Sequence, residues 1–116
     1  MIISFFCLSC KRVDEAKILT TCDEKSINNF LWFQEIKNGK TECTIYKGAT
    51  LYMFFPDDST SAAKETLFLL ENPAASLGTC LSVLYNCSGK VKSLLGEDRT
   101  KFLEAHTNGK IIWQKD

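Results

Sequence analysis

The stretch KTECTIYKGATLYMFFP at residues 40–56 is the densest run of β-branched and aromatic residues in the chain. These residue types are enriched in strands because their side chains pack well on a pleated surface. Asn38-Gly39 precedes the stretch, Gly48 interrupts it and Pro56 ends it, and all three residue types are typical of turns. We therefore predict that residues 40–56 form the central strands of an antiparallel sheet.

The N-terminal third of the chain predicts two further strands and one ambiguous segment. Residues 1–10, MIISFFCLSC, are apolar on both alternating faces, as in a strand buried within a sheet. Residues 16–22, AKILTTC, favour a second strand that forms a hairpin with the first. Residues 26–29 predict a helical turn or loop. Residues 30–37 fit either a helix or a hairpin strand, and their length favours the helix.

The C-terminal half predicts mainly helices. Residues 62–71 contain strong helix formers, and residues 74–86 place four large apolar side chains at helical spacing. Residues 97–106 predict a third, short helix, and residues 110–114 a closing strand. The whole chain, residues 1–116, is then a single α+β domain. We expect an antiparallel sheet of about five strands with two to three helices packed on one face.

One part of this pattern resembles a known family. A buried first strand, an early hairpin and a strand that ends in Asp-Asp and leads into a helix are similar to trafficking modules of the longin and roadblock type. The resemblance is carried by LYMFFPDDSTSAAKETLFLL at residues 51–70. It is a likeness of architecture, and a shared fold does not by itself fix a function.

The charge balance narrows the classes of partner. Fourteen Lys and Arg residues balance fourteen Asp and Glu residues, so the formal net charge is zero. A protein that binds nucleic acid by itself uses excess positive charge to displace counterions from phosphates. We therefore expect a protein partner or a large assembly, with nucleic acid only as part of a ribonucleoprotein. No apolar run approaches the roughly 20 residues that cross a bilayer, so no membrane span is expected.

The chain has six cysteines, at positions 7, 10, 22, 43, 80 and 87. Whether they form disulfides depends on whether the protein works in an oxidising or a reducing compartment. The first nine residues lack the basic start and small-residue cleavage site of a secretory signal. This pattern predicts a cytoplasmic protein whose thiols are mostly free and buried.

Cys7 and Cys10 form the sharpest local motif, C-x-x-C. Such a pair at a strand end is typical of a thioredoxin-like dithiol oxidoreductase, in which Cys7 would be the nucleophile. The same pair could supply two of the four ligands of a structural zinc ion, the one cofactor that the sequence suggests. Buried packing thiols are the third interpretation, and the commonest for free cysteines.

Other polar clusters have ordinary structural explanations. His106, the single histidine, lies at the end of a predicted helix and is expected to cap it. Four basic residues could contact phosphate, although a solvated face is the preferred explanation for them. They are Lys90, Lys92, Arg99 and Lys101.

Several aromatic residues exceed what one face of a strand can bury, because neighbouring side chains point to opposite faces. Exposed aromatic residues often anchor a partner protein. The residues that we select as anchors are Tyr46, Tyr52, Phe54 and Trp113. The function that follows is a non-catalytic interaction module, a small subunit or regulatory factor of a larger assembly. A cysteine- or zinc-stabilised accessory factor of a ribonucleoprotein and the dithiol oxidoreductase are the alternatives.

Overall fold

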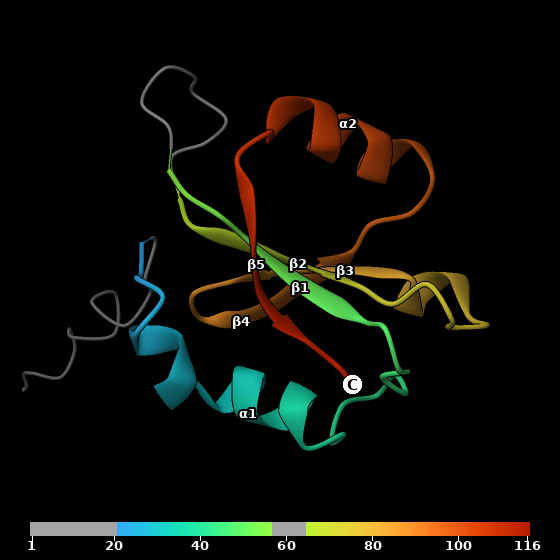
Figure 1. Ribbon diagram of the computed structural model, residues 1–116. Coiled ribbons are helices and arrows are strands. Elements are labelled where there is room, and N and C mark those ends of the chain that lie inside the picture. Colours follow the sequence, from blue (N-terminus) through green and yellow to red (C-terminus); the bar gives the residue numbers. More distant parts are fainter. Residues whose placement is uncertain (1–20, 57–64) are drawn as a thin grey trace, which may run out of the picture.

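A computed structural model describes residues 21–56 and 65–116 of the protein. In this part the chain forms a five-stranded antiparallel sheet (Figure 1). The strands lie in the order β4-β3-β2-β1-β5. Their bounds are β1 Thr50–Phe54, β2 Leu67–Glu71, β3 Ser82–Asn86, β4 Gly89–Ser93 and β5 Gly109–Gln114. The predicted α+β class with an antiparallel sheet is confirmed. Of residues 40–56, which were expected to form the central strands, only Thr50–Phe54 is a strand, and β2 rather than β1 lies at the centre of the sheet.

Two α-helices and two short 3-10 helices accompany the sheet. They are η3 Ser26–Asn29, α1 Leu31–Lys37, η4 Gly78–Cys80 and α2 Glu97–Ala105. Figure 1 shows α1 on one side of the sheet and α2 on the other. The prediction that the helices pack on a single face is therefore wrong for the described part of the chain.

Alternation along the strands explains why both faces need a cover. Leu51 and Met53 of β1 belong to the core cluster that contains α1, whereas Phe54 belongs to the cluster that contains α2. Tyr52 packs on the same side as Phe54. Successive side chains of a strand point to opposite faces, so a strand that is apolar at every position requires two covering layers.

The helices predicted over residues 62–71 and 74–86 are wrong. Leu67–Glu71 is strand β2, and residues 74–86 contain η4 and strand β3. In β2, Phe68 and Leu70 face the α1 cluster while Leu67 and Leu69 face the α2 cluster. A continuous apolar run of this length is compatible with a fully buried strand as well as with a helix, and burial on both faces decides for the strand.

The other sequence predictions have mixed outcomes. The helix alternative for residues 30–37, the helical turn at residues 26–29, the helix at residues 97–106 and the strand at residues 110–114 are confirmed. The strands predicted for residues 1–10 and 16–22 lie outside the described residues, apart from residues 21 and 22. The resemblance to longin and roadblock modules expected a helix over residues that the structure assigns to β2, so its main element is wrong.

Two disulfides join segments that lie far apart in the chain. Cys22 bonds to Cys87 at the β3–β4 turn, and Cys43 in the loop before β1 bonds to Cys80 of η4. The prediction of free thiols is thus wrong for these four cysteines. Each bridge closes a long segment of chain, 65 and 37 residues respectively.

The edge strands of the sheet join their neighbours irregularly. The register between β1 and β5 shifts at Leu51 and Tyr52, and that between β3 and β4 shifts at Leu84 and Tyr85. The inner pairs β1–β2 and β2–β3 have no shift. A shift of this kind marks a β-bulge, which bends a strand and increases its twist.

Candidate functional site

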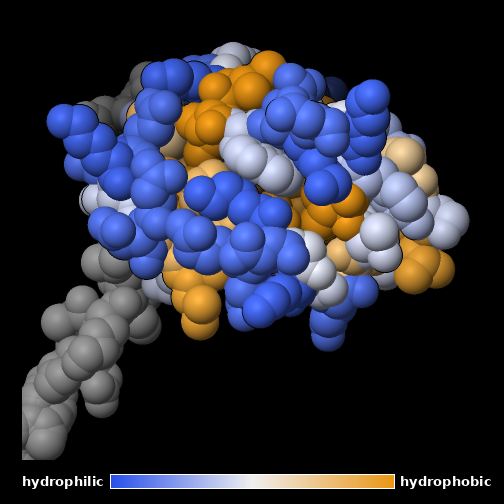
Figure 2. Space-filling model, turned by 60° about the horizontal axis from the view of Figure 1, so that its bottom comes forward, coloured by the Kyte–Doolittle hydropathy of each residue, from blue (hydrophilic) through white to orange (hydrophobic). Residues whose placement is uncertain are grey.

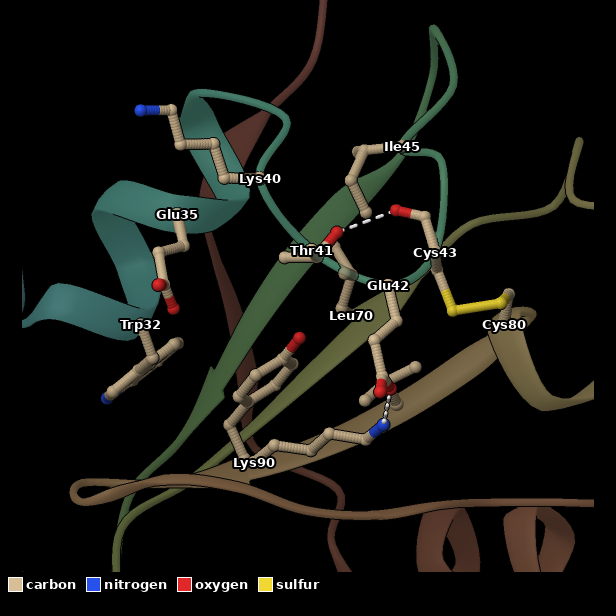
Figure 3. A pocket seen from close by; sticks show the side chains of 12 residues that line it. Trp32, Glu35, Lys40, Thr41, Glu42, Cys43, Ile45, Leu70, Cys80 and Lys90 are labelled. Atoms are coloured by element: carbon tan, nitrogen blue, oxygen red, sulfur yellow. Dashed lines mark hydrogen bonds and ion pairs between the residues drawn. A yellow bond between two sulfur atoms is a disulfide. The ribbon is translucent and has the colours of Figure 1, made fainter.

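A cavity of about 340 Å³ lies between α1, the loop at residues 40–45 and the α1-facing side of the sheet. Its size is within the range of small-molecule sites. Figure 3 shows the side chains that line it. They are Trp32, Glu35, Lys40, Thr41, Glu42, Cys43, Ile45, Leu70, Cys80, Val83, Tyr85 and Lys90. Figure 2 shows the α1 side of the molecule, where hydrophilic side chains dominate and hydrophobic ones appear in separate patches.

Trp32 is fixed as one wall of the cavity by α1 and the β3–β4 turn. The helix places Trp32, Phe33 and Ile36 against the sheet, following the three- and four-residue spacing of one helical face. The indole Nε1 donates a hydrogen bond of 3.2 Å to the carbonyl of Cys87. The Trp32 ring also stacks on Tyr85 of β3, with a centroid distance of 4.8 Å and an interplanar angle of 15°. The aromatic wall is therefore held in place by contacts within the protein itself.

The loop on the opposite rim is held by covalent and polar contacts. Cys43 is bonded to Cys80. The side chain of Asn72 donates to the Thr44 carbonyl at 2.9 Å and accepts the Tyr46 backbone N–H at 3.1 Å. Asn72 is completely buried at the end of β2. The rim is thus anchored to η4 through the disulfide and to the end of β2 through Asn72.

Two ionisable groups from the helix and the sheet meet in this cavity. Burial, and to a smaller extent the negative charge of Glu35, raise the pKa of Tyr85 to about 12. The raised pKa indicates that burial and one nearby carboxylate disfavour the charged phenolate. Lys90 forms an ion pair of 3.2 Å with Glu42 at the mouth.

The predicted partner anchors do not share one surface. Trp113 packs edge-on against Phe33 on the α1 side of the sheet, with the ring centroids 6.3 Å apart. Tyr46 is exposed in the loop before β1. Tyr52 and Phe54 lie on the α2 side.

Tyr52 and Phe54 are brought together with Arg99 around a second cavity of about 350 Å³ beneath α2. Arg99 is engaged there: its Nε donates to Glu71 at 3.0 Å, and this hydrogen bond raises the pKa of Arg99. Phe54 is buried against the edge of Phe102. Phe54 is thus part of the core, while its role as an anchor stays a prediction.

The four basic residues expected near phosphate are divided by the sheet. Lys90 pairs with Glu42 beside the α1-side cavity, and Arg99 pairs with Glu71 beneath α2. Lys92 on β4 and Lys101 on α2 are exposed. The structure brings no more than one of the four to each cavity.

The remaining chemical predictions concern Cys7, Cys10 and His106. Both cysteines lie outside the described residues, so their zinc and dithiol roles stay predictions. Within residues 21–56 and 65–116 no group of three or more His, Cys, Asp or Glu side chains is arranged to hold a metal ion. His106 is the C-cap of α2, as predicted, and its Nδ1 lies 2.9 Å from the Phe102 carbonyl.

Sequence reasoning missed the residues that matter most in the α1-side cavity: Trp32, Glu35 and Tyr85. Trp32 and Glu35 fall in the segment whose helix or strand character was ambiguous, and Tyr85 in a segment assigned to a helix. The spacing of Trp32 and Glu35 gives one usable signal: residues i and i+3 share a face of a helix, so these two side chains are expected on the same side of α1. Nothing in the sequence indicates that β3 lies opposite that face.

Comparison with known proteins gives no match: no family model, no curated protein and no solved structure is similar enough to inform on the function. In the described ranges, no helix has the length and apolar character needed to cross a membrane.

Proposed function

We propose that the protein is a non-catalytic binding domain that holds a small ligand in the cavity between α1 and the sheet. The observation that carries this proposal is the stacked pair of Trp32 and Tyr85 beside a cavity of about 340 Å³. Apolar side chains from three strands or loops, Ile45, Leu70 and Val83, complete the lining. An apolar cavity with a few polar groups on a pre-formed frame is the usual form of a small-molecule site.

The test is binding of a neutral fluorescent probe, N-phenyl-1-naphthylamine, followed by its emission and by competition with candidate ligands. Val83 is buried in the lining, so Val83→Phe fills the cavity and is expected to weaken probe binding at least tenfold. Thr41→Phe obstructs the rim with less risk to the core, because Thr41 is partly exposed. Lys92→Phe, outside the lining, is the matched control. Equal probe binding by all four proteins would contradict the site.

We also propose that the domain works in an oxidising compartment. Disulfides persist where thiols are not continuously reduced, so Cys22–Cys87 and Cys43–Cys80 favour such a compartment over the expected cytoplasm. The measurement is alkylation of the protein isolated from its natural source and denatured without a reductant, followed by mass spectrometry. Protection of these four cysteines supports the proposal, and labelling of all six thiols contradicts it.

The interaction module remains a second candidate, because large apolar side chains are exposed around η4. Leu77 and Leu95 are 65% and 50% exposed, and Leu81 is 39% exposed. Exposed apolar patches often mark protein-binding surfaces. Elution of the endogenous protein from a gently prepared extract, with and without nuclease, tests this candidate. Elution near 13.1 kDa contradicts it, and nuclease sensitivity of a larger particle supports the ribonucleoprotein alternative.

The zinc and dithiol alternatives depend on Cys7 and Cys10. Stoichiometric zinc in protein purified without added metal supports the first, and no metal together with unchanged stability in a chelator contradicts it. A Cys7 thiol that is alkylated at pH 6 much faster than an ordinary cysteine supports the second, and an ordinary rate contradicts it.

A further inference from the structure

The charges around the α1-side cavity are unequally compensated. Four charged side chains line it: Glu35, Glu42, Lys40 and Lys90. Lys90 and Glu42 neutralise each other in an ion pair. Figure 3 shows the ammonium group of Lys40 directed away from the other lining side chains. The carboxylate of Glu35 is therefore the uncompensated charge that is directed toward the other lining side chains.

Glu35 has no counter-ion in the described part of the chain. Its carboxylate takes part in none of the ion pairs or side-chain hydrogen bonds found there. Lys37, two residues along α1, is also engaged elsewhere, because its Nζ lies over the Phe33 ring at 4.6 Å from the centroid. A carboxylate without a partner beside an apolar cavity is a site of attraction for a cation.

The surroundings of Glu35 suit the apolar part of an organic cation better than a hydrated metal ion. Figure 3 shows the Glu35 carboxylate pointing toward Trp32, which lies one helical turn before it on α1. The charge of Glu35 also reaches Tyr85, since it contributes to the raised pKa of that phenol. Aromatic rings beside a carboxylate attract cations through the ring quadrupole as well as through the charge.

We propose that the ligand of this cavity is a small organic cation, a primary alkylamine whose short chain carries an apolar ring. Its ammonium group pairs with the Glu35 carboxylate, and its ring packs between the Trp32–Tyr85 wall and the apolar side chains opposite. This inference rests on the proposed ligand-binding function and specifies the chemical class of the ligand.

Three probes with the same ring and different head groups test the inference: 3-phenylpropylamine, 3-phenylpropan-1-ol and 3-phenylpropanoate. Binding to the full chain is measured by calorimetry and by the change in tryptophan fluorescence. We expect the amine to bind at least tenfold more tightly than the alcohol, and the carboxylate to bind most weakly. In Glu35→Gln the amine should lose this tenfold preference while the alcohol binds as before.

Glu104→Gln is the control for net charge, because Glu104 is exposed on α2, on the other side of the sheet. It should retain the preference for the amine. Equal binding of the three probes, or tightest binding of the carboxylate, would overturn the cation while leaving the ligand-binding function in place. If no probe binds but N-phenyl-1-naphthylamine does, the cation is again overturned and the function stands. If none of the four compounds binds, both proposals fail.

Discussion

Asn72 links backbone groups of two distant segments near the candidate site. It is completely buried, and its amide holds the loop at residues 44–46 through one donated and one accepted hydrogen bond. Its backbone N–H also donates to the Leu81 carbonyl at 2.8 Å. A sequence alone suggests a turn at Asn72-Pro73, but it does not show which loop the amide will reach, because the partners lie 26 and 28 residues earlier.

Asn72→Ala is expected to lower the free energy of unfolding by about 2 kcal/mol, because two backbone groups lose their partner in a partly buried place. Urea unfolding followed by circular dichroism measures the change. Asn108→Ala is the control, since Asn108 is exposed and forms a single long hydrogen bond of 3.5 Å. Its effect should stay within about 0.5 kcal/mol. Equal midpoints for both variants would contradict the role of Asn72.

Tyr85 predicts a loss of stability at alkaline pH. Its pKa rises from 10.0 in the unfolded chain to about 12 in the fold, so folding favours the neutral phenol. This contribution is complete below pH 10.0 and is lost as the pH rises towards about 12, at a cost of about 3 kcal/mol. Phenolate absorbance against pH, with parallel unfolding measurements, tests this prediction. Tyr85→Phe should lack the late titration phase, and a wild-type protein without that phase would contradict the prediction.

At the scale of elements, β5 depends on a residue without a side chain. A Cβ atom at Gly109 would lie 2.7 Å from Cε2 and 2.9 Å from Cζ of Phe54, across the β1–β5 pair. The Phe54 ring is itself confined by Phe102, whose centroid is 5.2 Å away at an interplanar angle of 89°. Gly109 therefore allows β5 to lie directly over an aromatic ring of the core.

Gly109→Ala is expected to destabilise the fold by about 1–3 kcal/mol, because the ring cannot move aside without disturbing the α2 cluster. Gly78→Ala is the matched control: the nearest atom to its added Cβ is Leu95 Cδ2 at 4.0 Å, an ordinary contact. Thermal unfolding of both variants measures the difference. A loss of stability in Gly78→Ala as large as that in Gly109→Ala would argue against the ring contact as the cause.

A helix or strand can be predicted from the sequence more readily when only one of its faces is buried than when both are. The segment at residues 97–106 has acidic residues in its first turn and was identified correctly as a helix. The segments that became β2 and β3 are buried on both faces, with no alternation of polar and apolar residues. Local pattern cannot distinguish such a strand from a buried helix, because the distinction depends on neighbours supplied by distant parts of the chain. The cavity was missed for the same reason, since it forms where α1 meets β3.

At the scale of the whole molecule, the two disulfides are expected to have similar effects on stability and different effects on binding. Closing segments of 65 and 37 residues stabilises a fold by about 4 kcal/mol each in the loop-entropy description. Cys43 and Cys80 line the α1-side cavity, whereas Cys22 and Cys87 do not. Replacing either pair by Ala should lower the melting temperature, but only the Cys43/Cys80 variant should bind N-phenyl-1-naphthylamine less tightly below its melting transition.

Two measurements separate these effects: thermal unfolding of both double variants, and probe titration at a temperature where both are folded. Unchanged probe binding by the Cys43/Cys80 variant would contradict the role of that bridge in shaping the rim. An unchanged melting temperature in both variants would show that neither bridge limits the unfolded state of the chain.

The bulges at both edges of the sheet have a consequence for how the protein behaves at high concentration. An open edge strand presents unpaired backbone groups on which another chain can add a strand, which is the first step of fibril growth. Here β4 and β5 are each joined to the sheet through a shift of register, and each carries lysine, Lys90 and Lys92 on β4 and Lys110 on β5. Twisted, charged edges are poor templates for such addition. The protein can therefore stay monodisperse although its sheet is apolar and its net charge of zero provides no repulsion between copies.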